Sequence, residues 1–354
     1  MRVLILWAEL NGERQTVATA LAEQFSKMNI ECEIAEVCSF FGGRDAHTKL
    51  SKCYAKACAS KSGRFAKDLE ELCGRGAEEL QIKLQAEGFD TVVCTHVVAA
   101  LTQAQVKLKF NNAAPYYFVS TDYTWLPALS EVHADGYFVG HGWLYGAFIR
   151  CNIQADRLHA SGIPLPASFY QSSDRAKARR VLGLSEDGSV VLVNCMGSLH
   201  RRAYKNIRAL TSRLPKEITT VVLCGENETF MEQLRQIQTE RLVAVGNVQS
   251  IEPYLSAADV YITPPVGIWV AEAMAKRVPT LLKGSLRGYE TRNAAFLVDH
   301  GVTQLTKAPE QAVERVLALL KNPKNSEALQ EAMDSIMPPI AAEHICRYIL
   351  KREI

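Results

Sequence analysis

The strongest constraint on the fold is an alternation of short apolar runs with segments of helical length along the chain. Residues 3–7 have the composition of a buried strand, and residues 16–27 follow with apolar side chains at helical spacing. Further runs of strand length cover residues 32–35, 91–94, 116–119 and 136–139. Strands that alternate with helices predict a parallel sheet joined by right-handed crossovers.

The same pattern begins again near residue 189, with apolar runs at 190–193, 220–223, 242–245, 260–262 and 279–282. The two sets are separated by residues 162–168, where two prolines and small residues are typical of a connection between domains. A length of 354 residues also suits two domains. We therefore predict an α/β protein with two doubly wound, Rossmann-like domains that face each other across a cleft. Residues 1–167 form the first, residues 168–339 form the second, and a C-terminal helix at about 340–354 packs back on the first.

Composition excludes several classes of function. The net charge of +2 gives no overall attraction to nucleic acid. Ten cysteines include no CxxC pair, so the spacing does not indicate a zinc site or a thioredoxin-like motif. No secretory signal and no apolar run of about 20 residues is visible. We expect a cytoplasmic protein with reduced thiols that needs no metal or other cofactor.

A series of short motifs, in a fixed order, indicates a family. They are Thr121-Asp122-Tyr123, Ala134–Val139, Ser161–Pro164, Val222–Asn227, Ala257–Thr263, Glu272–Ala275 and Gly288-Tyr289-Glu290 with Asn293. In order and spacing the chain resembles the diacylglycerol glycosyltransferases. These include the processive bacterial glucosyltransferases and the plant monogalactosyldiacylglycerol synthases, in glycosyltransferase family 28. The resemblance implies a GT-B fold, a UDP-sugar donor in the second domain, a lipid acceptor at the first, and metal-independent inversion at the anomeric carbon.

The donor's diphosphate would need backbone N–H groups, a helix N-terminus and hydroxyls to bind its charge. Two glycine turns that follow strands of one sheet can supply these groups, one with Gly197 and Ser198 and one with Gly267 and Ile268. Glu272, farther along the second helix, is expected to accept hydrogen bonds from ribose hydroxyls. The alternatives are ordinary turns and, for Glu272, a solvated helix charge.

The resemblance completes the donor site. It places uracil near Val248 and the sugar hydroxyls near Tyr289, Glu290 and Asn293. Asn227, the last residue of one of the motifs, is a further candidate for a donor contact in the same domain. The chain departs from the family in the turns themselves, because Pro265 lacks an N–H that could bind phosphate. Pro264 stands eight positions before Glu272, where retaining enzymes of this fold commonly carry a second glutamate, and this favours inversion.

Inversion by direct displacement needs one base for the proton of the acceptor hydroxyl. Asp122, at the end of a strand, is the first choice, and Glu13 is the second because it stands where relatives carry a histidine. Asn11, Gly12 and His96 are further candidates for the acceptor site. A capping role for Asp122 and a helix-dipole role for Glu13 are the alternatives, and a histidine at a strand end is more often structural.

Residues 42–69 form a basic segment that stands out in a nearly neutral chain. Seven lysines and arginines face only two aspartates there, and Phe40, Phe41, Leu50, Tyr54 and Phe65 are interleaved. Such a segment can lie on anionic lipid, where each cation contributes about 1 kcal/mol. A solvated basic helix is the alternative, and a nucleic-acid patch lacks a supporting motif. The candidate membrane residues are Arg44, Lys49, Lys52, Lys56, Lys61 and Arg64.

The sequence thus predicts a peripheral enzyme on the inner face of the cell membrane. It would transfer glucose or galactose from a UDP-sugar to diacylglycerol or a related lipid and give a β-glycoside. A polyprenyl- or sphingoid-type acceptor is one alternative. A degenerate protein that binds the nucleotide-sugar without turnover is another, motivated by the altered donor turns and the missing histidine.

Overall fold

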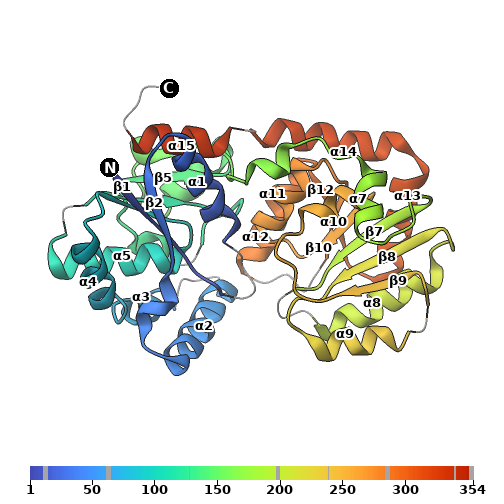
Figure 1. Ribbon diagram of the computed structural model, residues 1–354, viewed down its shortest axis with the longest axis horizontal. Helices are drawn as coiled ribbons and strands as arrows, with labels where there is room; N and C mark the ends of the chain where they lie inside the picture. Colours follow the sequence, from blue (N-terminus) through green and yellow to red (C-terminus); the bar gives the residue numbers. More distant parts are fainter. Residues whose placement is uncertain are drawn as a thin grey trace. The chain divides into compact units, whose positions relative to one another are not determined.

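The structure is a computed structural model that describes residues 1–10, 15–60, 65–112, 114–126, 128–196, 200–237, 239–283, 288–338 and 340–350. The chain divides into two compact units (Figure 1). Unit 1 comprises Met1–Pro166, Arg287–Arg292 and Pro338–Ile354, and unit 2 comprises Ala167–Leu286 and Asn293–Met337.

Unit 1 is built on a six-stranded sheet in the order β2-β1-β3-β4-β5-β6, in which every neighbouring pair is parallel. The central strands are continuous apolar runs because helices cover both faces of a parallel sheet. The strands are β1 (Arg2–Trp7), β2 (Glu31–Glu36), β3 (Thr91–Cys94), β4 (Tyr116–Val119), β5 (Gly136–Val139) and β6 (Leu158–Ala160).

The helices of unit 1 lie on both faces of this sheet because successive crossovers run in opposite directions along the sheet. The chain passes first from β1 to β2 through α1, and later from β3 to β4 through α5. Right-handed crossovers in opposite directions place the two helices on opposite faces. The helices are α1 (Thr16–Lys27), α2 (Arg44–Ala59), α3 (Ala66–Cys73), α4 (Ala77–Glu87), α5 (Val97–Phe110) and α6 (Tyr145–Ile149), with one-turn 3₁₀ segments at Val37–Phe41, Leu129–Glu131, Gly142–Leu144 and Ala155–Arg157.

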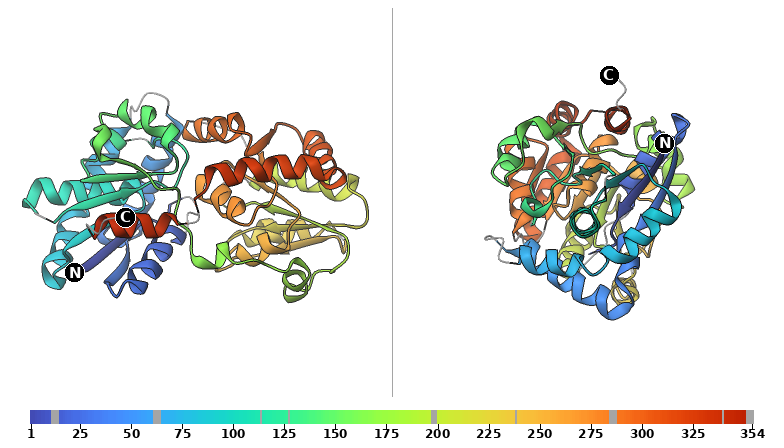
Figure 2. Two further views of the ribbon diagram at one scale, coloured as in Figure 1. Left: turned by 90° about the horizontal axis from the view of Figure 1, so that it is seen from above. Right: turned by 90° about the vertical axis from the view of Figure 1, so that its left-hand side faces the viewer.

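The C-terminal helix α15 (Ala341–Ile349) belongs to unit 1, where it packs against α1 (Figure 2). The Cys346 thiol donates to the carbonyl of Leu21 at 3.8 Å. The Tyr348 ring packs at a tilt against the His159 ring, with centroids 4.1 Å apart. The end of the chain therefore completes the core of the unit that the start of the chain builds.

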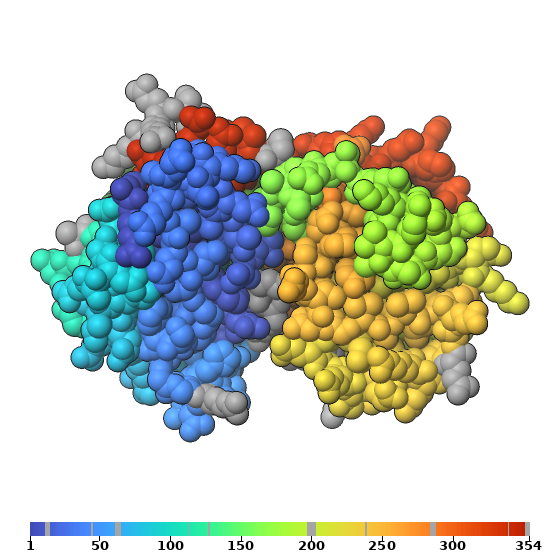
Figure 3. Space-filling view, in the orientation of Figure 1, coloured from blue at the N-terminus to red at the C-terminus, as the bar shows by residue number. Residues whose placement is uncertain are grey.

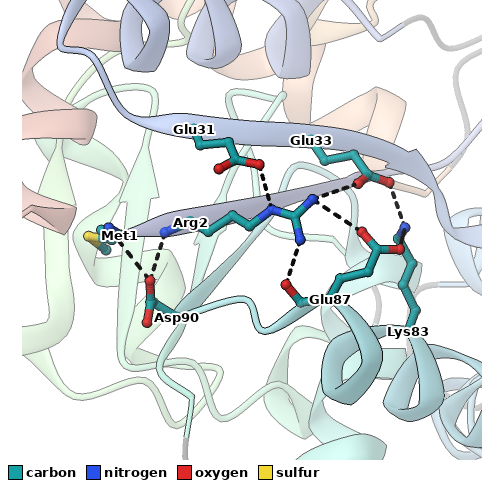
Figure 4. A network of polar contacts seen from close by, with 7 residues as sticks. All are labelled: Met1, Arg2, Glu31, Glu33, Lys83, Glu87 and Asp90. Atoms are coloured by element: carbon teal, nitrogen blue, oxygen red, sulfur yellow. Dashed lines mark hydrogen bonds and ion pairs between the residues drawn. The ribbon is translucent and has the colours of Figure 1, made fainter.

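A charged cluster holds together the amino edge of the unit 1 sheet (Figure 4). Arg2, the first residue of β1, makes ion pairs with Glu31, Glu33 and Glu87, and its backbone N–H donates to Asp90. Lys83 contacts Glu33 and Glu87 at 2.6 Å each. These charges join the starts of β1 and β2 to the end of α4, at the edge opposite the carboxyl ends of the strands, so they are structural.

Unit 2 repeats the plan with a six-stranded parallel sheet in the order β12-β11-β10-β7-β8-β9. The strands are β7 (Ser189–Asn194), β8 (Ile218–Leu223), β9 (Leu242–Val245), β10 (Val260–Thr263), β11 (Thr280–Lys283) and β12 (Thr303–Thr306). The helices are α7 (Arg175–Val181), α8 (His200–Arg213), α9 (Glu228–Arg235), α10 (Glu252–Ala257), α11 (Gly267–Ala275), α13 (Pro309–Lys321) and α14 (Pro323–Ile336), preceded by a 3₁₀ turn at Ala167–Tyr170. The two parallel α/β sheets predicted from the sequence are confirmed.

Helix α12 (Tyr289–Asp299) is divided between the two units. Its first turn clusters with unit 1, where Gly288 has a φ of +54° and a Cβ at this position would overlap the carbonyl of Cys58. Only glycine accepts both the left-handed backbone and this close approach. The rest of α12, from Asn293 onward, clusters with unit 2.

Candidate active site

The natural ligand position in unit 2 is the carboxyl end of its sheet between β7 and β10. The chain runs from β7 to β8 on one side and returns to β10 on the other, so the strand order reverses between these two strands. In open α/β sheets ligands bind outside the carboxyl ends at this switch point. The turns that follow β7 and β10 are the two that the sequence assigns to diphosphate.

The turn after β7 is fixed by Asn194. Its side-chain amide donates to the Tyr261 hydroxyl on β10 at 2.9 Å, and its side-chain oxygen accepts from the backbone N–H of Met196 at 3.0 Å. The hydrogen bond between Asn194 and Tyr261 therefore links β7 to β10 at the switch point. Gly197 and Ser198, the predicted phosphate contacts of this turn, lie outside the described residues.

The turn after β10 leads into the N-terminus of α11. Val266 donates its N–H to the carbonyl of Pro264 at 2.9 Å, and α11 begins at the buried residues Gly267 and Ile268. Among the described residues no side chain caps this helix. Asn293 is fully buried and its amide donates to the carbonyl of Pro265 at 2.7 Å, so it shapes this turn.

Glu272 lies on α11 and is only 2 % exposed. A charge on a solvated helix face, the alternative considered from the sequence, would be exposed. A buried carboxylate is costly unless a polar partner accompanies it. Burial next to the turn after β10 therefore favours a binding or structural role over a solvated one.

Two further predicted donor residues lie after β8 and β9. Asn227 caps α9, because its side-chain oxygen accepts the N–H of Phe230 at 2.8 Å. Val248 is half-buried in the segment that follows the edge strand β9. Both positions are at the carboxyl edge of the sheet, and the side chain of Asn227 has a structural task there.

Tyr289 and Glu290, expected beside the sugar, lie in the first turn of α12 and therefore in unit 1. Arg292 follows them and stacks its guanidinium 3.8 Å from the ring centroid of Trp125, while donating to that residue's carbonyl at 3.3 Å. Trp125 lies three residues after Asp122. Unit 1 thus joins a turn from the second half of the chain to the loop that carries the candidate base.

Asp122 follows β4 and is 2 % exposed. The Ser120 hydroxyl donates to its carbonyl at 3.1 Å and accepts its backbone N–H at 3.4 Å. The side-chain hydroxyl of Ser120 thus holds the backbone of Asp122 on both sides. Glu13, the second candidate base, and the neighbouring Asn11 and Gly12 lie outside the described residues.

His96 has a clear structural task at the start of α5. Its Nδ1 accepts the N–H of Val98 at 3.1 Å, and its ring packs edge-on against Tyr54 with centroids 4.8 Å apart. Because Nδ1 accepts this N–H, Nε2 is the ring nitrogen left to donate. This cap agrees with the structural interpretation of a histidine at a strand end.

Helix α2 carries the predicted membrane lysines. Lys49, Lys52 and Lys56 are exposed, at a spacing that places them along one side of the helix. Part of this blue segment of the chain reaches the surface seen in Figure 3. Leu50 and Tyr54 are fully buried. The side chain of Arg44, and Lys61 and Arg64 altogether, lie outside the described part. Helical periodicity turns Leu50 and Tyr54 inward, so these two apolar side chains do not share the exposed surface of the lysines.

The part of the chain that the structure describes lacks two kinds of feature. No group of three or more His, Cys, Asp or Glu side chains could hold a metal ion there. Within the same residues, no helix has the length and apolar character required to cross a bilayer.

Comparisons with known proteins agree with this layout. The chain is 26% identical, over 370 residues, to the processive diacylglycerol beta-glucosyltransferase of Bacillus cytotoxicus, and this match covers 99% of the chain and 93% of the relative. The Bacillus mycoides enzyme of the same name gives 26% over 369 residues, with the same coverage. The chain resembles processive diacylglycerol glucosyltransferases. The resemblance expected from the sequence is thereby confirmed.

The family model for glycosyl transferases group 1 matches residues 191–322, which lie almost entirely in unit 2. Solved structures with the same fold include Staphylococcus aureus MnaA with UDP, at a TM-score of 0.68 and 13% identity over 99% of this chain and 97% of that one. Anabaena Alr3699/HepE in complex with UDP-glucose gives 0.64 and 15% over 98% and 99%. Acinetobacter baumannii MurG gives 0.62 and 14% over 99% and 100%. The predicted GT-B fold is confirmed.

Lys283, the last residue of β11, is a candidate that the sequence reasoning missed. It is half-buried, and burial lowers the pKa of its ammonium to about 8. The available signal was a lysine directly after the apolar run Thr280–Leu282, at the carboxyl end of a strand.

Proposed function

We propose that this protein transfers a hexose from a UDP-sugar to diacylglycerol or a related membrane lipid, with inversion at the anomeric carbon. The observation that carries the proposal is similarity to processive diacylglycerol beta-glucosyltransferases over 99% of the chain. Glucose is the favoured hexose because these relatives are named glucosyltransferases. The product would be a β-glycoside.

In the donor half, the proposal assigns the diphosphate to the turns after β7 and β10 and to the N-terminus of α11. A helix N-terminus offers N–H groups and a positive dipole end to an anion. Glu272, Val248 and Asn227 would lie toward the nucleoside, and Glu290 and Tyr289 toward the sugar. The buried position of Glu272 and the tie from Asn293 to Pro265 support a site of fixed shape.

In the acceptor half, Asp122 is the proposed base. It would take the proton of the lipid hydroxyl as that oxygen bonds to the anomeric carbon. The bond from this carbon to the diphosphate oxygen breaks at the same time, and UDP leaves with the electron pair. The buried position of Asp122 after the carboxyl end of β4, where ligands bind in sheets of this kind, supports this choice.

A donor-by-acceptor screen tests the function. The full chain is incubated with labelled UDP-glucose or UDP-galactose and with diacylglycerol in anionic vesicles, without added metal, and the product is identified by mass. We expect a monohexosyl or longer glycolipid, with UDP-glucose as the preferred donor. Products only on polyprenyl or sphingoid lipids would change the acceptor class. UDP-sugar binding without product on any lipid would favour the protein without turnover.

The exposed lysines of α2 are the proposed contact with anionic lipids on the inner face of the cell membrane. Replacing Lys49, Lys52 and Lys56 by Gln should lower the fraction that sediments with anionic vesicles, by about tenfold in partition coefficient or more. Each surface cation near anionic lipid contributes about 1 kcal/mol. Sedimentation with vesicles of phosphatidylglycerol and phosphatidylcholine measures the effect.

A matched control has the same change in net charge elsewhere. Lys216, Lys321 and Lys324 are exposed lysines of unit 2, and their replacement by Gln should leave sedimentation unchanged. Equal losses in the two triple variants would indicate an effect of total charge and refute a specific role for α2.

A further inference from the structure

The side chain of Lys283 is a partly buried cation without an anion beside it among the described residues. It is half-buried at the end of β11, and within the described part of the chain its ammonium makes no hydrogen bond or ion pair. Burial of an ammonium costs free energy unless an anion or several acceptors accompany it. The position therefore suits an anionic ligand, because the described residues provide no anion beside this ammonium.

The sheet register places this lysine at the switch point. Thr263 of β10 is paired with Leu282 of β11, and Ile262 of β10 is paired with Val193 of β7. Continued one step past the first pair and two steps past the second, this register places Lys283, Pro264 and Cys195 in one row at the ends of the three strands. The Cys195 thiol acts electrostatically on the Lys283 ammonium, which agrees with this row. The cation thus stands beside the turn that leads to α11.

The turn itself has few donors to offer. Pro264 and Pro265 have no N–H, and the N–H of Val266 is occupied by the carbonyl of Pro264. Two buried donors nearby in the chain, the Thr263 hydroxyl and the Trp269 indole N–H, find no acceptor among the described residues. A ligand rich in anionic oxygens at this turn would supply acceptors for such groups.

We propose that Lys283 binds the diphosphate of the nucleotide-sugar and stabilises the negative charge that UDP gains as it leaves. The inference rests on the proposed function. In the transfer step the acceptor oxygen bonds to the anomeric carbon, and the bond from that carbon to the β-phosphate oxygen breaks. The electron pair stays on that oxygen, the acceptor proton goes to the base, and the ammonium of Lys283 keeps its proton. The lysine supplies a positive charge to the diphosphate at a turn where the two prolines have no N–H to donate.

Binding of UDP and of uridine separates this role from a general one. We expect Lys283→Gln to weaken UDP binding by about tenfold to a hundredfold, the usual range for a charge-assisted hydrogen bond. Uridine, which lacks phosphate, should bind equally to both proteins. The matched control is Lys216→Gln, an exposed lysine next to the amino end of β8 in the same sheet, which should change neither affinity. Calorimetry measures UDP binding, and ligand-observed NMR measures uridine binding.

The pH dependence supplies a second readout. The ammonium loses its charge as the pH rises through about 8, because burial lowers its pKa. Cys195, the titratable group that acts on it, has a thiol pKa raised by burial to about 12 and stays neutral over this range. Affinity of the unaltered protein for UDP should therefore fall above pH 8. Lys283→Arg should keep tight binding and lose this fall, because arginine stays charged.

The outcomes are distinguishable. Failure of the unaltered protein to bind UDP would overturn the proposed function itself. If it binds UDP and Lys283→Gln keeps the same ratio of UDP to uridine affinity, the role of Lys283 is refuted and the proposed function stands. Should Lys283→Gln lose both ligands, Lys283→Arg decides: restored UDP binding without the fall above pH 8 supports the charge, and loss of both ligands again contradicts it.

Discussion

Replacing Arg179 by Met is expected to lower the free energy of unfolding of unit 2 by about 3–5 kcal/mol, the usual effect of removing one member of a buried ion pair. Arg179 is only 5 % exposed. Its guanidinium contacts the Asp259 carboxylate at 2.5 Å and donates to the carbonyls of Ala257, Glu186 and Gly188 at 3.1, 3.1 and 2.9 Å. Methionine fills a similar volume but cannot donate a hydrogen bond to the Asp259 carboxylate or to these three carbonyls.

Arg175 provides the matched control for this prediction. It contacts the same Asp259 at 2.9 Å, but its side chain is 54% exposed. Arg175→Met should therefore change the stability by less than about 1 kcal/mol, as is usual for surface ion pairs. Chemical denaturation followed by circular dichroism measures both variants. Similar losses of unfolding free energy in Arg179→Met and Arg175→Met would show that the buried hydrogen bonds of Arg179 contribute little.

Two charged networks lie at the amino edges of the two sheets. Asp259 joins α7 to the starts of β7 and β10, since it also accepts the backbone N–H of Val190 at 2.7 Å. The Arg2 cluster does the same for β1 and β2 in unit 1 (Figure 4). Stabilising charges at one edge leave the carboxyl edge open for binding groups. Arg179→Met should accordingly reduce stability without altering UDP affinity in the folded protein.

The strands were predictable wherever burial on both faces demands a continuous apolar run. The runs at 91–94, 116–119 and 136–139 are fully buried strands with the expected bounds. The sequence reasoning missed β6 and β12 because both are edge strands with polar residues, such as His159 in β6 and Gln304 in β12. An edge strand is only partly covered, so its composition lacks the apolar signal.

The site was predictable where chain order determines position, and not where it depends on packing between distant segments. Burial of Glu272 follows from its apolar neighbours on α11. By contrast, no local pattern shows that Arg292 stacks on Trp125, or that the first turn of α12 clusters with unit 1. Lys283 escaped notice because its importance comes from the cross-strand row, which only the register reveals.

The largest functional effect is expected at Asp122. Asp122→Asn keeps the size of the side chain and removes its ability to accept a proton. If Asp122 is the base, transfer should fall by about 10²- to 10⁴-fold, the usual contribution of general base catalysis. UDP affinity should not change, because Asp122 belongs to unit 1 and the proposed diphosphate contacts belong to unit 2. Steady-state transfer to diacylglycerol vesicles and calorimetric titration with UDP measure the two quantities.

The control is Asp156→Asn, an exposed aspartate next to the start of β6, which should leave transfer unchanged. A parallel Glu13→Gln variant separates the two candidate bases. Near-normal transfer by Asp122→Asn together with loss in Glu13→Gln would assign the proton to the loop after β1. The opposite result would leave Glu13 the role of a helix N-terminal charge, with an effect of about 1 kcal/mol or less on stability. Loss in both variants would indicate two carboxylates acting on one proton, and the pH profile of transfer would then show their coupling.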